Sequence, residues 1–409
     1  MHIGIAGPIA TCDVLPLLDA KSSQLPAGSE GAPLLATLIT ELLRRGHRVS
    51  AFTLSTDLPL RTREGVVARG RAFELHYRPC RPRAWPPNGR RPGRAMDLYA
   101  FERAGLREAI AAARPDVVHA HWAYEFAWAA LASGLPHVIT CHDSPLGVAR
   151  FACDLRHGAY RWMRAGIAWH VLRLARRVTS VSPYMAEQVQ PLCRVPVRVI
   201  ANPVSVQAAR GSTSVTVGAP RVLMASNGWS AWKNGLAGLR AHALLQRQVP
   251  DVELHLFGRG SEEGGPAWSA WRTLGAAPGV VFNGPVAHAG LLEAMVASDL
   301  LLHPALEESF GTVLAEAMST GLPVVAGSSS GAVPWVVGGA GVLVDVTRPE
   351  DMAEAMRRLL QDPAALRTLG ALGRERVRDC FSPAAVAGQY EAEYAAALSQ
   401  SSSPIEVAA

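Results

Sequence analysis

Short apolar runs alternate with longer amphipathic segments along almost the whole chain, and this alternation most constrains the fold. A short run of branched apolar residues is typical of a buried strand, whereas a longer segment with apolar residues at helical spacing is typical of a helix. Strands that alternate with helices form parallel sheets joined by crossover helices, so the sequence predicts an α/β fold. The predicted strands are Ile3–Ala6, Val49–Thr53, Val117–Ala120, His137–Cys141, Val178–Val181 and Val197–Ala201, then Val222–Ala225, Glu253–Phe257, Val280–Phe282, Leu300–Leu302, Val324–Val325 and Val342–Val344.

A Gly-, Ser- and Thr-rich stretch at residues 203–220 contains no predicted element and lies between the two halves of this pattern. With 409 residues the chain is long enough for two domains with separate hydrophobic cores. We therefore predict a first domain at residues 1–203, a second domain at 204–382 and a C-terminal helix at 383–400.

Two segments of the first domain have a clear local signature. The predicted helix Leu34–Arg45 ends at Gly46, and glycine is the residue that most often caps a helix C-terminus. Residues 78–94 are rich in Pro and Arg and predict a long exposed loop.

The composition excludes several classes of protein. Hydrophobic residues make up 49% of the chain and charged residues 18%, which is unlike a disordered protein. The six cysteines have no paired spacing, which argues against a zinc site or a disulfide framework and favours reduced thiols. No Lys or Arg precedes Lys21, as a signal peptide would require, and no apolar span is long enough to cross a bilayer. We expect a cytoplasmic protein.

The net charge of +6 is concentrated in two stretches. Residues 61–114 contain thirteen Arg against five acids, and residues 150–177 contain seven Arg against Asp154 alone. The second stretch also holds Trp162 and Trp169 and predicts a helix that could lie on the anionic inner face of a membrane. The alternative is a packing helix with a solvated Arg face. No nucleic-acid recognition motif accompanies the charge, so we expect no nucleic-acid partner.

A predicted strand, loop and helix at residues 300–325 carry two carboxylates, Glu308 and Glu316. If the helix starts near Gly311, its free N–H groups and positive dipole end form an anion-binding mouth. The two carboxylates could then accept hydrogen bonds from hydroxyls on two parts of one ligand. A polyhydroxylated ligand with phosphate groups fits this arrangement, and a solvated Glu316 on an ordinary amphipathic helix is the alternative.

The residues around this pair, Glu308-Ser-Phe-Gly311 and then Glu316-Ala-Met318, resemble the donor-sugar motif of the retaining glycosyltransferases of family 4. The resemblance extends through most of the chain. It implies the GT-B fold, in which two Rossmann-like domains with parallel sheets face each other across a deep cleft. The first domain would bind the acceptor, the second the nucleotide-sugar donor, and the C-terminal helix would cross back to the first.

The resemblance also implies a reaction. A hexose-type sugar would move from a nucleotide-diphosphate donor to an acceptor hydroxyl with retention of the anomeric configuration. In the family the first Glu of the motif touches sugar hydroxyls and the second binds the ribose, which assigns these roles to Glu308 and Glu316.

His142 is a candidate catalytic residue because it follows a predicted parallel strand, at the edge where ligands bind in open α/β sheets. Thr140-Cys-His-Asp143 resembles the family's His-Asp segment that faces the donor. A His that is satisfied locally is the alternative. His119 and His121 share one face of another strand, where a metal site would need a third ligand that is not evident; they would line the cleft or pack.

Lys233 follows the first strand of the second domain, where a cation can neutralise a diphosphate leaving group. An exposed lysine is the ordinary alternative. The family has Gly-Arg and then Lys-Gly here, whereas this chain has Ser226-Asn-Gly228 and then Lys233-Asn234. The usual arginine is missing, so Lys233 acts alone or Arg259 assists it.

The resemblance extends to a larger set of residues near the donor. The candidate catalytic residues are His142, Lys233 and Glu308, and the candidate donor-binding residues are Gly28, Gly31, Gly258, Arg259, Phe282, Asn283, Ser309, Phe310, Gly311, Thr312 and Glu316.

We expect no cofactor besides the nucleotide sugar, and no metal, because the chain has no Asp-x-Asp motif. The acceptor would be a carbohydrate or a lipid-linked molecule. The Ala- and Arg-rich composition is typical of GC-rich bacteria, which suggests a polysaccharide or glycoconjugate product. A nucleotide-sugar epimerase of the same fold and a catalytically silent nucleotide-sugar-binding protein stay open as alternatives. A dehydrogenase would need Gly-x-Gly-x-x-Gly after the first strand, and Gly4 and Gly7 lack that spacing.

Overall fold

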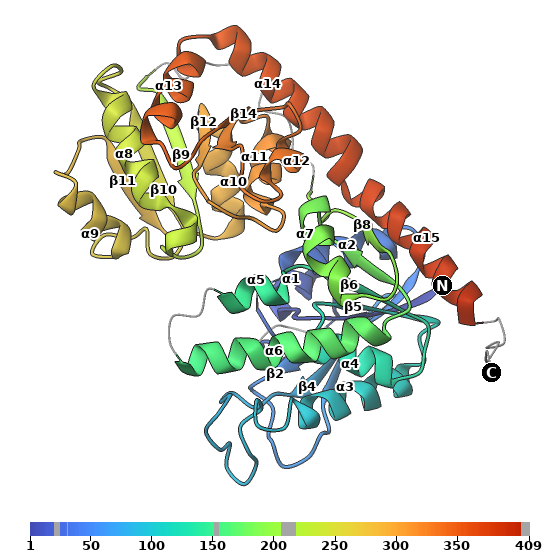
Figure 1. The fold of residues 1–409 in the computed structure, drawn as a ribbon. Coiled ribbons are helices and arrows are strands. Elements are labelled where there is room, and N and C mark those ends of the chain that lie inside the picture. The colour runs from blue at the N-terminus through green and yellow to red at the C-terminus, as the bar shows by residue number, and fades with distance from the viewer. Residues whose placement is uncertain (20–24, 31, 151–154, 206–217, 402–409) are drawn as a thin grey trace. The chain divides into compact units, whose positions relative to one another are not determined.

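The computed structural model describes residues 1–19, 25–30, 32–150, 155–205 and 218–401. The chain forms two compact units, each built on its own sheet (Figure 1). Unit 1 comprises Met1–Pro203 together with the chain from Val386 on, and unit 2 comprises Val204–Ala385. Most of the predicted linker, residues 206–217, lies outside the described residues.

Unit 1 contains an eight-stranded sheet in the order β3-β4-β2-β1-β5-β6-β7-β8. All neighbouring strands are parallel except β3 and β4, which are antiparallel. The six predicted strands of this half are confirmed, with ends that differ by up to two residues. The strands are β1 His2–Ala6, β2 Arg48–Ser55, β3 Val66–Gly70, β4 Phe73–Pro79, β5 Val117–His121, β6 His137–Cys141, β7 Val178–Ser180 and β8 Val197–Val199.

The predicted exposed loop at residues 78–94 is wrong in two respects. Its first two residues end β4, and the Arg81 side chain is fully buried. The Arg81 guanidinium donates to both carboxylate oxygens of Asp97 and of Glu102 at distances of 2.6 to 2.9 Å. A buried cation needs such partners, because removing one from a buried ion pair costs about 3–5 kcal/mol. The segment is therefore held to α3 (Ala100–Ala113) by a buried ion-pair network.

Helices cover the unit 1 sheet, and each predicted helix of this half is present. The predicted Leu34–Arg45 is α2, and Gly46 after it has a φ of +85°, which glycine adopts without strain. The basic stretch contains α6, the long green helix of Figure 1. The helices are α1 Thr11–Val14, α2 Pro33–Arg44, α3 Ala100–Ala113, α4 Glu125–Ala132, α5 Pro145–Arg150, α6 Leu155–Leu174 and α7 Pro183–Val189, with 3-10 turns at Leu15–Leu17 and Gln190–Leu192. None of the described helices is long and apolar enough to span a bilayer.

The C-terminal helix α15 (Pro383–Ser401) belongs to unit 1 from Val386 on. Glu391 on α15 pairs with Arg45 at 2.6 Å, and Glu393 pairs with Arg177 at 2.7 Å. The Tyr390 and Tyr394 side chains are buried, 2% and 0% exposed. Ion pairs at the rim and aromatic rings beneath them thus fix this helix to unit 1.

Unit 2 contains a six-stranded sheet in the order β11-β10-β9-β12-β13-β14, in which every neighbouring pair is parallel. The six strands predicted for this half are confirmed. They are β9 Arg221–Ala225, β10 Glu253–Phe257, β11 Val280–Gly284, β12 Leu300–His303, β13 Val324–Gly327 and β14 Val342–Val344. The helices are α8 Gly235–Gln246, α9 Pro266–Thr273, α10 His288–Val296, α11 Thr312–Thr320, α12 Val333–Val337, α13 Pro349–Leu360 and α14 Pro363–Arg376, with a 3-10 turn, η4, at Ala231–Lys233 and a π-helical turn at Val377–Phe381.

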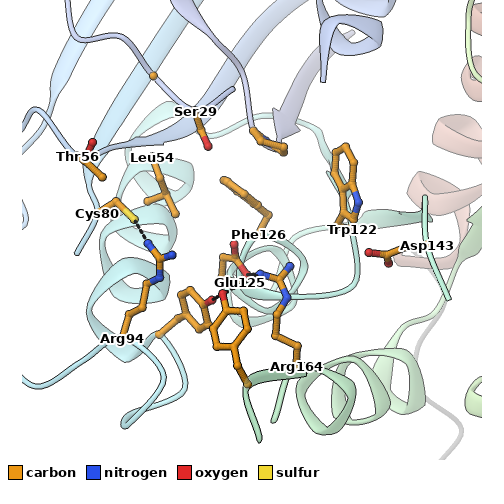
Figure 2. A pocket seen from close by; sticks show the side chains of 14 residues that line it. Ser29, Leu54, Thr56, Cys80, Arg94, Trp122, Glu125, Phe126, Asp143 and Arg164 are labelled. Atoms are coloured by element: carbon orange, nitrogen blue, oxygen red, sulfur yellow. Dashed lines mark hydrogen bonds and ion pairs between the residues drawn. The ribbon is translucent and has the colours of Figure 1, made fainter. Parts of the chain in front are cut away.

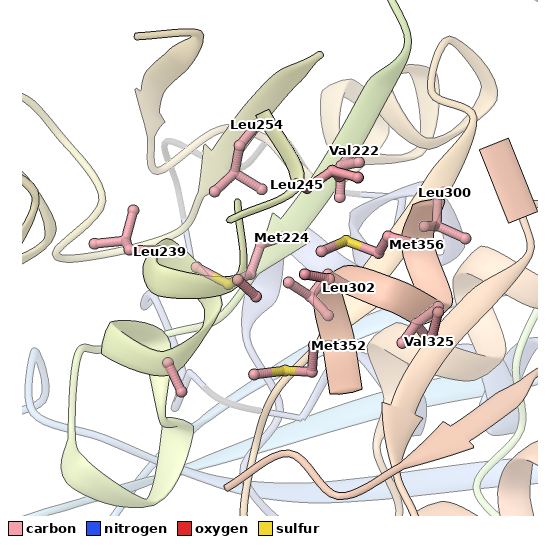
Figure 3. Packing of buried hydrophobic residues seen from close by; sticks show 14 of the residues in the cluster. Val222, Met224, Leu239, Leu245, Leu254, Leu300, Leu302, Val325, Met352 and Met356 are labelled. Carbon is pink, nitrogen blue, oxygen red and sulfur yellow. The ribbon is translucent and has the colours of Figure 1, made fainter. Parts of the chain in front are cut away.

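The core of unit 2 lies between its central strands and the helices α8 and α13 (Figure 3). Leu239 and Leu245 of α8 and Met352 and Met356 of α13 face apolar side chains of β9, β10, β12 and β13. Burying a side chain of this size contributes about 1.5–3 kcal/mol, so the sheet is held firmly. The loops that follow its strands therefore project from a rigid base.

Candidate functional site

The loop between β12 and α11 carries the carboxylate pair. Gly311 precedes α11 with a φ of +86°, a conformation that favours glycine, and no side chain caps this helix end. The first N–H groups of α11 therefore have no partner within the helix. The predicted helix start near Gly311 and its end at Gly321 are both confirmed.

The Phe310 side chain is buried and does not face a ligand. Its ring is 2% exposed and packs edge-on against Trp335 and Phe381, with centroids at 6.3 and 5.4 Å. The ring anchors the loop in the core, so only the backbone of Phe310 can reach a ligand. Ser309 before it and Thr312 after Gly311 are half-buried.

Glu308 is brought together with Lys233 and with a residue that the sequence did not single out, His303. Its Oε1 atom lies 2.6 Å from Lys233 Nζ and 3.4 Å from His303 Nε2. Burial alone would raise the pKa of Glu308, but the hydrogen bond and charge of His303, and then those of Lys233, lower it to about 2. Glu308 is therefore an ionised hydrogen-bond acceptor at neutral pH.

Hydrogen bonds from Asn234 hold Lys233 close to Glu308. It has a φ of +52°, a region that Asn tolerates better than most residues, and it stands where the family has glycine. Its side-chain amide donates to the carbonyls of Pro304, at 3.1 Å, and Val346, at 2.8 Å. The turn that carries Lys233 is thus tied to the loop that carries Glu308.

Glu316 lies on α11 and has a different partner. Its Oε1 atom is 2.7 Å from Nε2 of His288, at the start of α10. The Glu316 side chain is 16% exposed, and the His288 side chain is 57% exposed. The two carboxylates therefore have separate partners, and the His beside each carboxylate is the feature that sequence reasoning missed.

The turn after β10 packs against the segment from which the expected arginine is missing. Gly228 N–H donates to the carbonyl of Arg259 at 3.0 Å, and a Cβ on Gly258 would lie 2.1 Å from the Ser226 carbonyl. Gly258, with a φ of +101°, is therefore required for this close approach. Arg259 is exposed beside the position of the missing cation.

Phe282 and Asn283 lie on β11, at the edge of the sheet. The Phe282 ring packs edge-on against Trp268 and Trp271, each at 5.4 Å, whereas Asn283 is exposed. The carbonyl of Gly284 accepts a hydrogen bond from Gly258 N–H at 2.8 Å. The end of β11 and the Gly258–Arg259 turn are thus neighbours.

His142 belongs to a buried cluster of rings in unit 1. Its Nε2 atom lies 2.9 Å from Nδ1 of His121, and its ring stacks on Trp122 with centroids 4.2 Å apart. Burial lowers the pKa of His142 to about 3. The ring is therefore neutral at physiological pH and can act through hydrogen bonds but not through charge.

His119 and His121 share one face of β5, as predicted, with ring centroids 4.0 Å apart. His119 Nδ1 lies 2.8 Å from the Tyr394 hydroxyl, and its Nε2 atom lies 2.7 Å from Thr140 Oγ1. Both ring nitrogens of His119 are thus engaged in hydrogen bonds within unit 1. Among the described residues, no group of three or more His, Cys, Asp or Glu side chains is placed to hold a metal ion.

Gly28 lines a cavity of about 310 Å³ in unit 1, shown in Figure 2. It pairs with Ala10, has a φ of +79°, and a Cβ there would lie 2.3 Å from the Ile9 carbonyl. Ser29, Trp122 and Asp143 also line the cavity. Gly31, the other glycine predicted here, lies outside the described residues.

Two family profiles match the chain. The one described as Glycosyltransferase Family 4 matches residues 33–208, and the one described as Glycosyl transferases group 1 matches residues 219–362. Together they cover most of both units.

Curated relatives match parts of the chain. A trehalose synthase from Rubrobacter xylanophilus is 30% identical over 41% of this chain and 41% of its own length. An MMP alpha-(1->4)-mannosyltransferase from Mycolicibacterium hassiacum is 34% identical over 39% of each chain. The chain thus spans about two fifths of the length of these relatives.

Solved structures match nearly the whole chain. Sucrose-phosphate synthase from Thermosynechococcus elongatus superimposes with a TM-score of 0.71 at 20% identity, over 98% of this chain and all of the other. Anabaena HepE, solved with UDP and glucose, superimposes with a TM-score of 0.66 at 18% identity, over 97% of this chain and all of the other. These matches show the GT-B fold. The two profiles, which agree with the Glu308–Glu316 motif, show that the chain belongs to glycosyltransferase family 4, among the group 1 glycosyltransferases.

Proposed function

We propose that the protein is a retaining glycosyltransferase that moves a hexose-type sugar from a nucleotide-diphosphate donor to an acceptor hydroxyl. The observation that carries this proposal is the cluster of Lys233, Glu308 and His303 beside the uncapped start of α11. Unit 2 would bind the donor and unit 1 the acceptor.

The diphosphate of the donor would bind to the uncapped N–H groups of α11 and to the ammonium of Lys233. Both place positive charge where negative charge grows as the sugar leaves, and such preorganised groups stabilise a transition state. Arg259 would supply the second cation, because it lies beside the segment that lacks the family's arginine. No metal ion is needed in this arrangement of charges.

The carboxylates of Glu308 and Glu316 would accept hydrogen bonds from hydroxyl groups of the donor. Glu308 stays ionised at neutral pH, since its pKa is about 2, and can accept hydrogen bonds from the donor sugar. Glu316 would accept hydrogen bonds from the ribose, and the exposed Asn283 beside the Gly258 turn would contact the base. His142, as a neutral ring, would present one hydrogen-bonding nitrogen to the reacting sugar.

We also propose that α6 rests on an anionic membrane surface, which would suit a lipid-linked acceptor. Trp162 and Trp169 are seven residues apart on one face of α6, and their side chains are 57% and 51% exposed. The guanidinium of Arg173 lies 5.4 Å from the Trp169 ring, and Arg176 is exposed two residues after the end of α6. Exposed Trp side chains on one helix face, with Arg side chains near one end of that helix, are typical of a helix at a membrane interface.

A turnover assay with UDP-, GDP- and ADP-sugars tests the proposed reaction. We expect one donor to be consumed by the wild-type chain, and Glu308→Gln to lower turnover by about a hundredfold. Glu293→Gln, an exposed position on α10, is the matched control and should behave as wild type. Donor conversion to an epimer without transfer would favour the epimerase, and binding without turnover of any donor would favour the silent binder.

A further inference from the structure

The cavity of about 310 Å³ in unit 1 has two chemically different ends (Figure 2). Trp122 and Asp143 lie at one end, and Arg94, Cys80 and Thr56 lie at the other. Aromatic rings between and beside these ends offer flat surfaces against which a sugar or cyclitol ring can stack. A ligand in this cavity would therefore bind in one orientation.

Trp122 connects the first end to the reacting centre of the proposed function. Its ring stacks on that of His142, with centroids 4.2 Å apart. An acceptor hydroxyl at this end would be the one nearest to the candidate catalytic histidine. The group at the Arg94 end would then be remote from the hydroxyl that reacts.

Arg94 is half-buried at the second end of the cavity. Among the described residues, no carboxylate lies within ion-pair distance of its guanidinium. Nη1 of Arg94 donates to the Arg81 carbonyl at 2.7 Å and contacts Cys80 Sγ at 3.7 Å, while the buried Nε has no hydrogen-bond partner. A half-buried cation with an unused donor is costly unless a ligand supplies an acceptor.

The other charged groups of the cavity have partners of their own. The Arg164 guanidinium lies 3.7 Å over the Tyr124 ring and 3.9 Å from Glu125. Asp143 accepts a hydrogen bond from the Tyr124 hydroxyl at 3.0 Å. Arg164 thus has a carboxylate partner in Glu125, whereas the Arg94 guanidinium has no carboxylate partner among the described residues.

We propose that this cavity binds an acceptor ring that carries an anionic substituent, a phosphate or a carboxylate, and that Arg94 binds this anion. That the ligand is the acceptor rests on the proposed function; the preference for an anion does not. The ring lies toward Trp122 with its reacting hydroxyl near His142. Glu125 is 9% exposed, and its Oε2 atom, which has no hydrogen-bond partner, accepts a hydrogen bond from another ring hydroxyl.

Binding of small probes to the full chain tests this inference without any turnover. Glucose 6-phosphate, mannose 6-phosphate, glucuronate and glucose would be titrated by calorimetry. We expect at least one anionic probe to bind about ten- to a hundredfold more tightly than glucose, since hydrogen bonds to charged groups are the strong ones. Comparison of the phosphates with glucuronate identifies the anion.

Arg94→Gln should abolish the preference for the anionic probe and leave glucose binding unchanged. Gln removes the charge and keeps a hydrogen-bonding amide at the chain length of Arg94 Nε. Arg90→Gln, an exposed position on the same loop, is the matched control and should keep the preference. Equal binding of glucose and all three anions, binding of none of the anions, or an unchanged preference in Arg94→Gln would overturn the inference.

The results of these experiments distinguish a failure of this inference from a failure of the proposed function. Anion binding through Arg94 without turnover of any donor would contradict the glycosyltransferase proposal and leave the binding site standing. Turnover with a neutral acceptor and no effect of Arg94→Gln would contradict the inference alone.

Discussion

Glu308 couples the stability of unit 2 to pH. Its folded-state pKa of about 2 lies below the ordinary value of 4.5, so its contacts with His303 and Lys233 stabilise the fold fully above about pH 4.5. That stability is lost as the pH falls from 4.5 toward 2, and it amounts to at most on the order of 3 kcal/mol. We predict that Glu308→Gln flattens the fall in the free energy of unfolding over this window, measured by urea denaturation at several pH values.

Glu293→Gln provides the comparison, because it removes an exposed carboxylate from the same unit. Its stability should fall with acid as steeply as that of the wild-type chain. An equally steep fall in Glu308→Gln would show that the Glu308 contacts do not stabilise the folded state.

The residues of this cluster differ in how far sequence could find them. The sequence predicted the Glu308–Glu316 pair and the helix start at Gly311, because glycine and a helix start have local signatures. His303 and His288 were missed, although His303 directly follows a predicted parallel strand, where site residues gather. The burial of the Phe310 ring depends on Trp335 and Phe381, which come from elements distant in sequence, so a local motif could not reveal it.

At the scale of the element, α6 makes the most specific prediction. If its Trp162–Trp169 face docks on anionic lipid, Trp162→Ser with Trp169→Ser should weaken binding to phosphatidylglycerol-containing vesicles by about tenfold or more, because two interfacial aromatic anchors are lost. Co-sedimentation with phosphatidylcholine vesicles, with and without phosphatidylglycerol, measures this effect. The wild-type chain should prefer the anionic vesicles and should lose that preference at high salt.

Leu372→Ser on α14 is the matched control, because this side chain is exposed, at 42%, on an element of unit 2. It should bind vesicles as the wild type does. A wild-type chain that ignores anionic vesicles, or that forms a dimer through the tryptophans, would exclude the membrane role.

The elements themselves were predictable wherever both sheet faces are buried. Such strands, for example β1 and β12, are short apolar runs. Less buried strands such as β8 and β11 were also found, so twelve of the fourteen strands among the described residues were predicted. The hairpin of β3 and β4 was missed, since its strands carry Arg, Glu and His among apolar residues and β3 is an edge strand of the sheet. Phe73, Leu75 and Tyr77 do alternate along β4 and are buried, so a search for period-two patterning would have found it.

At the scale of the whole molecule, unit 1 is completed by a segment nearly two hundred residues beyond its last strand. The sequence predicted a C-terminal helix at residues 383–400, but the pattern within a helix does not show which sheet the helix covers. The partners that decide this are Tyr394 with His119, Glu391 with Arg45 and Glu393 with Arg177. Each pair joins positions more than two hundred residues apart, and a single sequence does not reveal such contacts.

A chain that ends at Ala385 should therefore lose stability in unit 1 and not in unit 2. The truncation uncovers the buried face on which Tyr390 and Tyr394 pack, and it leaves Arg177 without its carboxylate. Two large buried rings and their neighbours make the cost at least about 5 kcal/mol, close to the whole stability of many domains. Hydrogen exchange resolves the two units, because backbone amides of β5 and β6 should lose protection while those of β9 and β12 keep theirs. A chain that ends at Ser401 keeps all of α15 and should match the wild type; unchanged protection of β5 and β6 in the shorter chain would mean that unit 1 is stable without the helix.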